Sequence, residues 1–152
     1  MIGLDIKVKN EYNNYIHKIF DGIDLSNYMC QINFDDSLYL QNGKIGQDIF
    51  KTNILNGDVF LKCIPKDEYY IIFSDIKIYP IDSKFDEIKT FEDFMKSNCQ
   101  MVFLCTDSTF IQFYSKDEVA LDKVYSNCIN NNFEDIKYID AEDALKRNLI
   151  AW

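Results

Sequence analysis

The sequence predicts an α+β fold, a single domain over residues 1–152 with a mixed, mostly antiparallel sheet of about six to seven strands and about three to five packed helices. Strand-like alternation occurs in neighbouring stretches joined by short turns, which favours hairpins over β-α-β winding. Helical patterns lie between these groups of strands. The composition is 47% hydrophobic, which suffices for a substantial core in one domain.

The N-terminal third is predicted to form a strand, a helix and a second strand. Residues 4–9 alternate apolar and polar side chains, which indicates a first strand. Asn10 is expected to cap a helix that runs to about Phe20, because apolar residues then recur at three-four spacing. Residues 28–34 alternate again and predict a half-buried strand.

The next stretch predicts a short meander. A strand is expected over residues 37–41, and Asn42-Gly43 favours a tight hairpin because both residues adopt positive φ readily. One short helix is expected before Pro65, and the remainder of residues 47–66 has no readable pattern.

Residues 69–81 form the longest apolar strand pattern of the chain. Thr90 then opens a helix, with Asp93 three residues later in a near capping-box arrangement. The buried stripe of this helix is expected to consist of Phe91, Phe94 and Met95.

The last third predicts a central hairpin followed by the best helix. Residues 100–106 are apolar on both faces, which is typical of a central strand that is covered on both sides. A turn at Asp107-Ser108 should lead to a partner strand over residues 109–114. Asp117 is expected to cap a helix that ends at Asn130-Asn131-Asn132.

A final strand is expected at residues 136–139, and Asp140 should cap a short helix after it.

The composition limits the chemistry that the chain can support. It has one histidine (His17), one arginine (Arg147) and five glycines, and shows no glycine-rich phosphate loop, catalytic triad or metal-ligand spacing. We therefore expect no cofactor and no metal, with a carboxylate-held magnesium ion as the minor alternative. Whether the protein is an enzyme stays open, with the balance against it.

Charge and cysteine usage restrict the partners and the compartment. A net charge of −9 argues against binding to nucleic acid, which relies on clustered Lys and Arg. No apolar run approaches the roughly 18 residues of a membrane span, and the first residues do not resemble a signal peptide. Five cysteines without a C-x-x-C pair predict reduced thiols, and hence a cytoplasmic protein.

Asp75 and Lys77 are the first candidate binding residues. They lie two positions apart in the longest strand pattern, so their side chains share one face. The pair marks either a pocket or partner surface, or a strand end that leaves the core and is solvated.

Four further candidates follow in the predicted central hairpin. Asp107 and Ser108 form either a small polar site or an ordinary turn, in which Asp and Ser bond their own backbone. Phe110 and Tyr114 flank Gln112 on one face of the next strand, and belong either to the core or to an interface.

Several short stretches resemble a family of small uncharacterised bacterial proteins, a domain of unknown function found mainly in Gram-positive spore formers. The stretches are residues 10–12, 72–77, 99–104, 107–108, 138–140 and 142–143, with Pro80, Tyr114, residues 116–117 and Trp152. The resemblance covers nearly the full length and departs at residues 144–148, where an Arg-Thr-like step is expected. It implies one full-length domain and a cytoplasmic bacterial protein, and it brings no chemistry.

Two functional hypotheses follow. The first is a non-enzymatic, acidic interaction protein that acts on a basic protein partner in the manner of an inhibitor or immunity protein, as the net charge and the 15% aromatic content favour. The alternative is a small ligand-binding or enzymatic domain with a polar site near Asp75, Lys77, Asp107 and Ser108, which requires these side chains to converge on one pocket.

Overall fold

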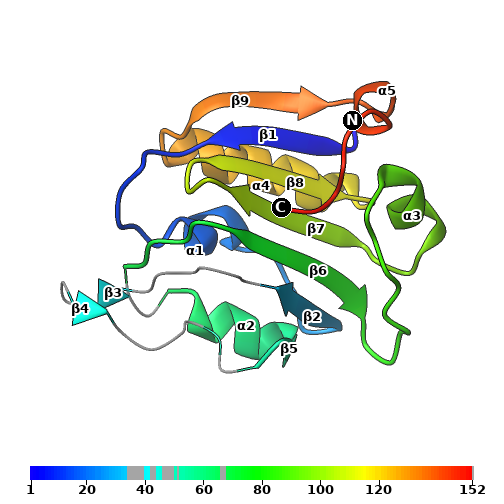
Figure 1. The fold of residues 1–152 in the computed structure, drawn as a ribbon, viewed down its shortest axis with the longest axis horizontal. Helices are drawn as coiled ribbons and strands as arrows, with labels where there is room; N and C mark the ends of the chain where they lie inside the picture. The colour runs from blue at the N-terminus through cyan, green and yellow to red at the C-terminus, as the bar shows by residue number, and fades with distance from the viewer. Residues whose placement is uncertain (34–39, 42–43, 46–49, 51, 66–67, 152) are drawn as a thin grey trace.

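The computed structural model describes residues 1–33, 40–41, 44–45, 50, 52–65 and 68–151. Within these residues, seven strands form one antiparallel sheet in the order β5-β2-β6-β7-β8-β1-β9 (Figure 1). The strands are β1 (Gly3–Lys7), β2 (Tyr28–Asn33), β5 (Ile54–Asn56), β6 (Ser74–Pro80), β7 (Met101–Thr106), β8 (Phe110–Ser115) and β9 (Glu134–Ile139). The predicted α+β class is confirmed.

Five helices are assigned in the same part of the chain: α1 (Tyr15–Phe20), α2 (Gly57–Cys63), α3 (Phe91–Lys96), α4 (Glu118–Asn130) and α5 (Ala141–Ala144). A separate ladder pairs β3 (Leu40–Gln41) with β4 (Lys44–Ile45), as the expected hairpin requires. The turn predicted at Asn42-Gly43 lies outside the described residues.

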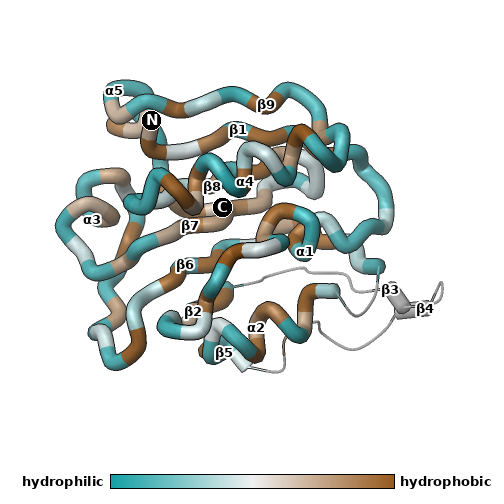
Figure 2. Tube along the Cα trace, turned by 180° about the vertical axis from the view of Figure 1, so that it is seen from behind, coloured by the Kyte–Doolittle hydropathy of each residue, from teal (hydrophilic) through white to brown (hydrophobic). Residues whose placement is uncertain are grey.

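One face of the sheet, the first face, packs against α1, α2 and α4. Figure 2 shows α1 and α4 lying over the strands when the molecule is seen from this side. The side chains at the centre of this core are completely buried; they include Ile16, Phe20, Phe60, Phe103, Phe113 and Val124. The Phe20 ring contacts Phe60, Phe103 and Phe113 at centroid distances of 5.3 to 5.9 Å, so one aromatic side chain links two helices to the middle of the sheet.

The opposite face, the second face, is only partly covered. A smaller apolar cluster joins the sheet to α3, α5 and the end of the chain, and includes Tyr79, Phe94, Val102, Tyr114, Ile139 and Leu149. Polar side chains occupy much of the remaining area. Across the sheet, Asn33 lies opposite Asp75, Leu104 opposite Gln112, and Asp5 opposite Lys137, so a largely polar row crosses this face.

The predicted central hairpin and three predicted helix starts are confirmed. β7 lies in the middle of the sheet with five of its six residues buried, and its turn to β8 holds Asp107 and Ser108 at positive φ. The Thr90 side chain accepts a hydrogen bond from the amide of Asp93, which completes a capping box for α3. Asp117 and Asp140 likewise accept amide hydrogen bonds at the starts of α4 and α5.

The first helix starts later than predicted, at Tyr15 and not after Asn10. Asn13 and Tyr69 exchange two main-chain hydrogen bonds, which hold both residues in an isolated antiparallel bridge. These bonds use backbone groups that an earlier helical turn would have required. The same bridge explains why the predicted strand over residues 69–81 begins only at Ser74.

Regular alternation over residues 69–81 would place Ile71 on the face of Asp75. That expectation is wrong, and so is the predicted burial of Met95. Ile71 belongs to the first-face core and does not share the face of Asp75, because regular alternation starts only at β6. Met95 is exposed, since α3 has only six residues and buries Phe91 and Phe94 alone.

Candidate functional site

The candidate site lies on the second face, where the end of the chain crosses the sheet. Residues 149–151, here called the C-terminal strap, run over the central strands in Figure 1. Leu149 donates its amide to the main-chain oxygen of Lys89 at 2.8 Å, which anchors the strap beside the start of α3. Farther along, the hydroxyl of Thr106 donates to the main-chain oxygen of Ala151 at 3.3 Å. Strand β7 and the segment before α3 thus hold the strap.

Asp75 and Lys77 bind the strap from the side of the sheet. Both project from β6 onto the second face, where they form an ion pair with each other. Lys77 also donates to the main-chain oxygen of Leu149 at 2.7 Å, and the carboxylate of Asp75 accepts the amide hydrogen of Ala151. Two charged side chains therefore bind a donor and an acceptor of the strap backbone.

The Asp75–Lys77 pair is buried, with 5% and 6% of each residue exposed. The interpretation that the strand end is solvated is therefore wrong, because the strap covers the pair. Burial raises the pKa of the Asp75 carboxyl, an effect that the Lys77 ammonium opposes. Burial likewise lowers the pKa of Lys77, and Asp75 opposes that change. Perturbed charged groups in a hollow are characteristic of functional sites.

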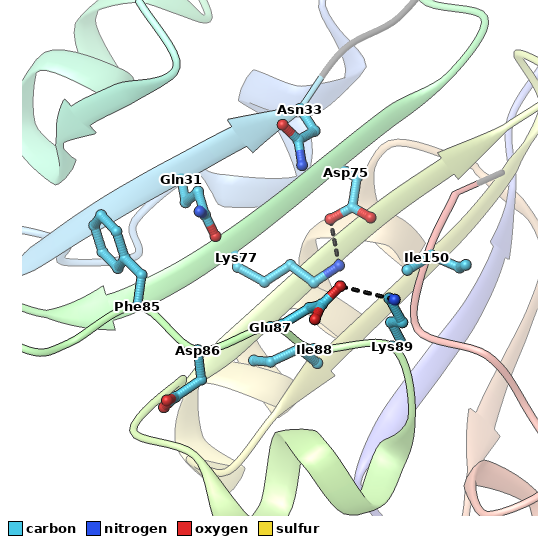
Figure 3. Close-up of a pocket in the computed structure, with 10 residues that line it drawn as sticks. All are labelled: Gln31, Asn33, Asp75, Lys77, Phe85, Asp86, Glu87, Ile88, Lys89 and Ile150. Carbon is cyan, nitrogen blue, oxygen red and sulfur yellow. Dashed lines mark hydrogen bonds and ion pairs between the residues drawn. The ribbon is translucent and has the colours of Figure 1, made fainter.

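A hollow of about 410 Å³, here called the β6 hollow, opens beside this pair (Figure 3). Its wall is formed by β2, β6, residues 85–89 and Ile150. Gln31 and Asn33 of β2 stand directly opposite Lys77 and Asp75 in the antiparallel register, so all four side chains share the second face. Neither amide side chain forms a hydrogen bond with another described residue. The hollow thus combines one compensated ion pair with two amides that have unused donors and acceptors.

A second hollow, of about 700 Å³, lies on the other side of the strap and is here called the β1 hollow. It is formed by β1, β8, β9, Thr106 at the end of β7, and residues 147–148 and 150–151. Ile150 lines both hollows, so the strap is the wall between them.

Asp107 and Ser108 do not join the β6 hollow. With positive φ angles of 54° and 64°, they form the three-residue turn between β7 and β8 together with Thr109. The Ser108 amide donates to the main-chain oxygen of Ile72, and the Asp107 oxygen accepts from the amide of Thr109. The four-residue polar site of the alternative hypothesis is therefore divided: Asp75 and Lys77 line a hollow, whereas Asp107 and Ser108 shape a turn.

Phe110 and Tyr114 share the second face, as the alternation predicted, but their environments differ. Tyr114 is completely buried, and its hydroxyl lies 3.2 Å from the side-chain oxygen of Gln112. Burial raises the pKa of Tyr114 to about 12. Phe110 is 55% exposed and lines the β1 hollow.

The β1 hollow and the contacts of the strap were not predicted from the sequence. Arg147, the single arginine, donates to Asp5 at 2.7 Å and also contacts Asp143, so it ties β1 to α5 beside this hollow. Residues 149–151 are all apolar and follow the polar pair at positions 147 and 148. This change was the only signal in the sequence that the end of the chain covers another part of the protein. Among the described residues, no three His, Cys, Asp or Glu side chains gather closely enough to hold a metal ion.

The fold and the site define a class: a small α+β domain in which a C-terminal strap divides one face of an antiparallel sheet into two hollows. The chain belongs to the family described as "Protein of unknown function (DUF2691)", whose model matches residues 1–150. The predicted full-length resemblance to a family of uncharacterised bacterial proteins is thereby confirmed.

One relative is similar over almost the whole chain. It is the uncharacterized protein YncE of Bacillus subtilis (strain 168), with 26% identity over 148 residues, which is 97% of each chain. No solved structure matches significantly. In the described part of this chain, no helix has both the length and the apolar character needed to cross a membrane.

Proposed function

We propose that this protein is a binding domain that holds a small, uncharged, amide-like molecule in the β6 hollow. The observation that carries the proposal is the position of the Gln31 and Asn33 amides, which form no hydrogen bond within the described residues, opposite the buried Asp75–Lys77 ion pair. A cytoplasmic location is part of the proposal, on the basis of the cysteine usage.

The chemistry of the hollow favours a neutral ligand. Asp75 and Lys77 compensate each other, so a charged group placed beside them would be attracted by one and repelled by the other. Gln31 and Asn33 each offer a carbonyl acceptor and an NH₂ donor. A primary amide, a urea or a uracil-like ring presents the same two functions side by side and can bind both amides. The volume of about 410 Å³ lies within the range of roughly 300–1,000 Å³ that is usual for small-molecule sites.

Titration followed by NMR of the ¹⁵N-labelled protein tests this proposal, with uracil and nicotinamide as neutral probes and acetate as a charged one. We expect amide signals of β2 and β6 to shift with the neutral probes only. The double variant Gln31→Ala/Asn33→Ala should weaken binding about thirtyfold, since the two lost hydrogen bonds are worth about 1 kcal/mol each. Asn130→Ala, an exposed amide at the end of α4, is the matched control. Equal binding by the double variant and the control would refute the proposal.

A second candidate function is the binding of a basic protein, and a surface at the free edge of the sheet supports it. Tyr125 of α4 stacks on Tyr138 of β9 at a centroid distance of 4.8 Å, and Tyr138 is 38% exposed. The Tyr138 hydroxyl lies 3.4 Å from the carboxylate of Asp122, and Glu118 precedes Asp122 by one helical turn. Exposed tyrosines beside carboxylates suit Lys and Arg side chains through cation–π and charge attraction.

The test for this candidate is an affinity pull-down from native lysate at low and high salt, read by mass spectrometry. We expect a basic protein to be recovered at low salt only, because screening weakens charge attraction. Asp122→Asn/Tyr138→Ala should lose that protein, whereas Lys123→Gln, on the same helix, should retain it. Recovery by both variants alike would place the contact elsewhere.

A further inference from the structure

The β1 hollow carries charges that the rest of the protein would not predict. The whole chain has a net charge of −9. Three cationic side chains (Lys7, Lys137 and Arg147) line this hollow, together with the carboxylates of Asp5 and Asp135. The carboxylates of Asp143 and Glu134 lie beside it, on Arg147 and opposite Lys7. Attraction of a small anion therefore depends on direct contact with the cationic side chains and not on a net positive charge.

The two lysines are the available cations. Arg147 is already engaged by Asp5 and Asp143. Lys7 and Lys137 form no ion pair with any described residue. They project from neighbouring strands onto the second face, where Lys137 stands opposite Asp5 and Lys7 opposite Glu134, with a β-bulge between these two pairs. Both lysines line the β1 hollow, so their long side chains can converge on one carboxylate there.

The remaining wall of the hollow is apolar. Phe110 stands directly opposite Lys7 across β1 and β8 and is 55% exposed, while Ile150 of the strap is 38% exposed. Exposed aromatic and aliphatic side chains in a concave surface gain free energy when an apolar group covers them. Thr106 and Gln112 add polar groups between the two.

We propose that the β1 hollow is a second binding site, distinct from the β6 hollow, for a small aromatic carboxylate. The carboxylate is held between Lys7 and Lys137, and the ring packs on Phe110 and Ile150. Asp135, at the rim, disfavours anions that carry more than one negative charge. The volume of about 700 Å³ accommodates a two-ring molecule.

The probe for this site is 2-naphthoate, with methyl 2-naphthoate as its uncharged analogue. The full-length protein is titrated with each probe, and binding is followed by the fluorescence of the ring and by ¹⁵N NMR. We expect naphthoate to bind at least tenfold more tightly than the methyl ester, with shifted signals in β1, β8 and β9. The affinity for naphthoate should fall as salt is raised, because the lysines are partly exposed.

Three variants make the test specific. Lys7→Gln/Lys137→Gln should reduce the affinity for naphthoate at least tenfold and leave the methyl ester unchanged, and Phe110→Ser should weaken the binding of both probes. Lys123→Gln, an exposed lysine on α4, should have no effect. Gln31→Ala/Asn33→Ala should also have no effect, which separates this site from the β6 hollow. Unchanged naphthoate binding by the double lysine variant, or equal affinity for the two probes, would overturn the proposal.

Discussion

The ammonium group of Lys77 donates a hydrogen bond to the main-chain oxygen of Leu149, 72 positions farther along the chain, at 2.7 Å. The same ammonium is paired with Asp75. One buried lysine therefore neutralises a carboxylate of the sheet and fixes the segment that covers it. The ion pair and the strap bury each other, so loss of either should expose both.

The variant Lys77→Met should destabilise the protein by about 3–5 kcal/mol, because it leaves the Asp75 carboxylate buried without its counter-charge. Asp75→Leu/Lys77→Met should lose clearly less, since an apolar pair needs no compensation. Urea unfolding followed by circular dichroism measures both. The single variant Asp75→Leu completes the comparison. If the double variant lost as much unfolding free energy as Asp75→Leu and Lys77→Met lose together, the two side chains would not be acting as a coupled unit.

Stability should decline steeply at alkaline pH because four thiols are buried. Burial raises the pKa of Cys30 and Cys128 to about 12 and that of Cys99 and Cys105 to about 11, from 9.0. A group whose pKa is raised on folding contributes stability that is complete below its unfolded pKa. That stability is lost as the pH rises through the folded pKa.

The loss should therefore fall between about pH 9 and pH 12, at roughly 1.4 kcal/mol per pH unit for each thiol. The urea midpoint measured from pH 7 to pH 10.5 should be constant at first and then fall. Cys30→Ala/Cys128→Ala should show a shallower decline. An equal slope in this variant would assign the alkaline sensitivity to other groups.

Asn127 should be important for the junction of α1 and α4. Its buried side chain donates to the main-chain oxygens of Ile19 at 3.0 Å and of Asp21 at 2.7 Å. The last carbonyls of a helix lack partners within the helix, so these bonds satisfy the end of α1. Asn127→Ala should cost about 1–3 kcal/mol of unfolding free energy, because the buried oxygen of Ile19 and the partly buried oxygen of Asp21 lose their donor.

The nearby Asn130→Ala is the control for this prediction, and it should change the stability by less than about 0.5 kcal/mol. Asn127→Asp should be at least as harmful as Asn127→Ala, since a carboxylate cannot donate to the carbonyls. Wild-type stability in Asn127→Asp would contradict the assigned hydrogen bonds.

Gly57 is required at the start of α2 by lack of space. A Cβ atom at this position would lie 2.0 Å from the main-chain oxygen of Leu25. Because backbone atoms cannot yield as a flexible side chain does, Gly57→Ala should cost about 3 kcal/mol. Thermal unfolding checks this, with the exposed Lys62→Ala in the same helix as the control. A wild-type melting temperature for Gly57→Ala would show that α2 can shift away from Leu25.

Local sequence patterns correctly predicted the elements that are stabilised by residues close to them in the sequence. The caps at Thr90, Asp117 and Asp140 each involve a contact within three residues, and the turn at Asp107-Ser108 contains the local bond from the Thr109 amide to Asp107; all were predicted correctly. The all-apolar pattern of β7 likewise indicated its central position.

Contacts between distant parts of the chain account for the failures. The bridge between Asn13 and Tyr69 shortened both α1 and β6, and nothing near either residue signals the other. Asp75 and Lys77 were selected correctly as an unusual pair, but their burial depends on the strap at residues 149–151. The separation of Asp107 and Ser108 from that pair follows from the turn geometry, which spacing alone does not determine.

The strap is held through its backbone, by Lys77 at Leu149 and by Asp75 and Thr106 at Ala151. Ile150, between these two anchors, takes part in none of these bonds and presents its side chain to both hollows. Evolution could therefore exchange this one side chain without disturbing the path of the chain. A larger or smaller residue at position 150 would resize two cavities at once, which makes it the natural place for related proteins to diverge in what they recognise.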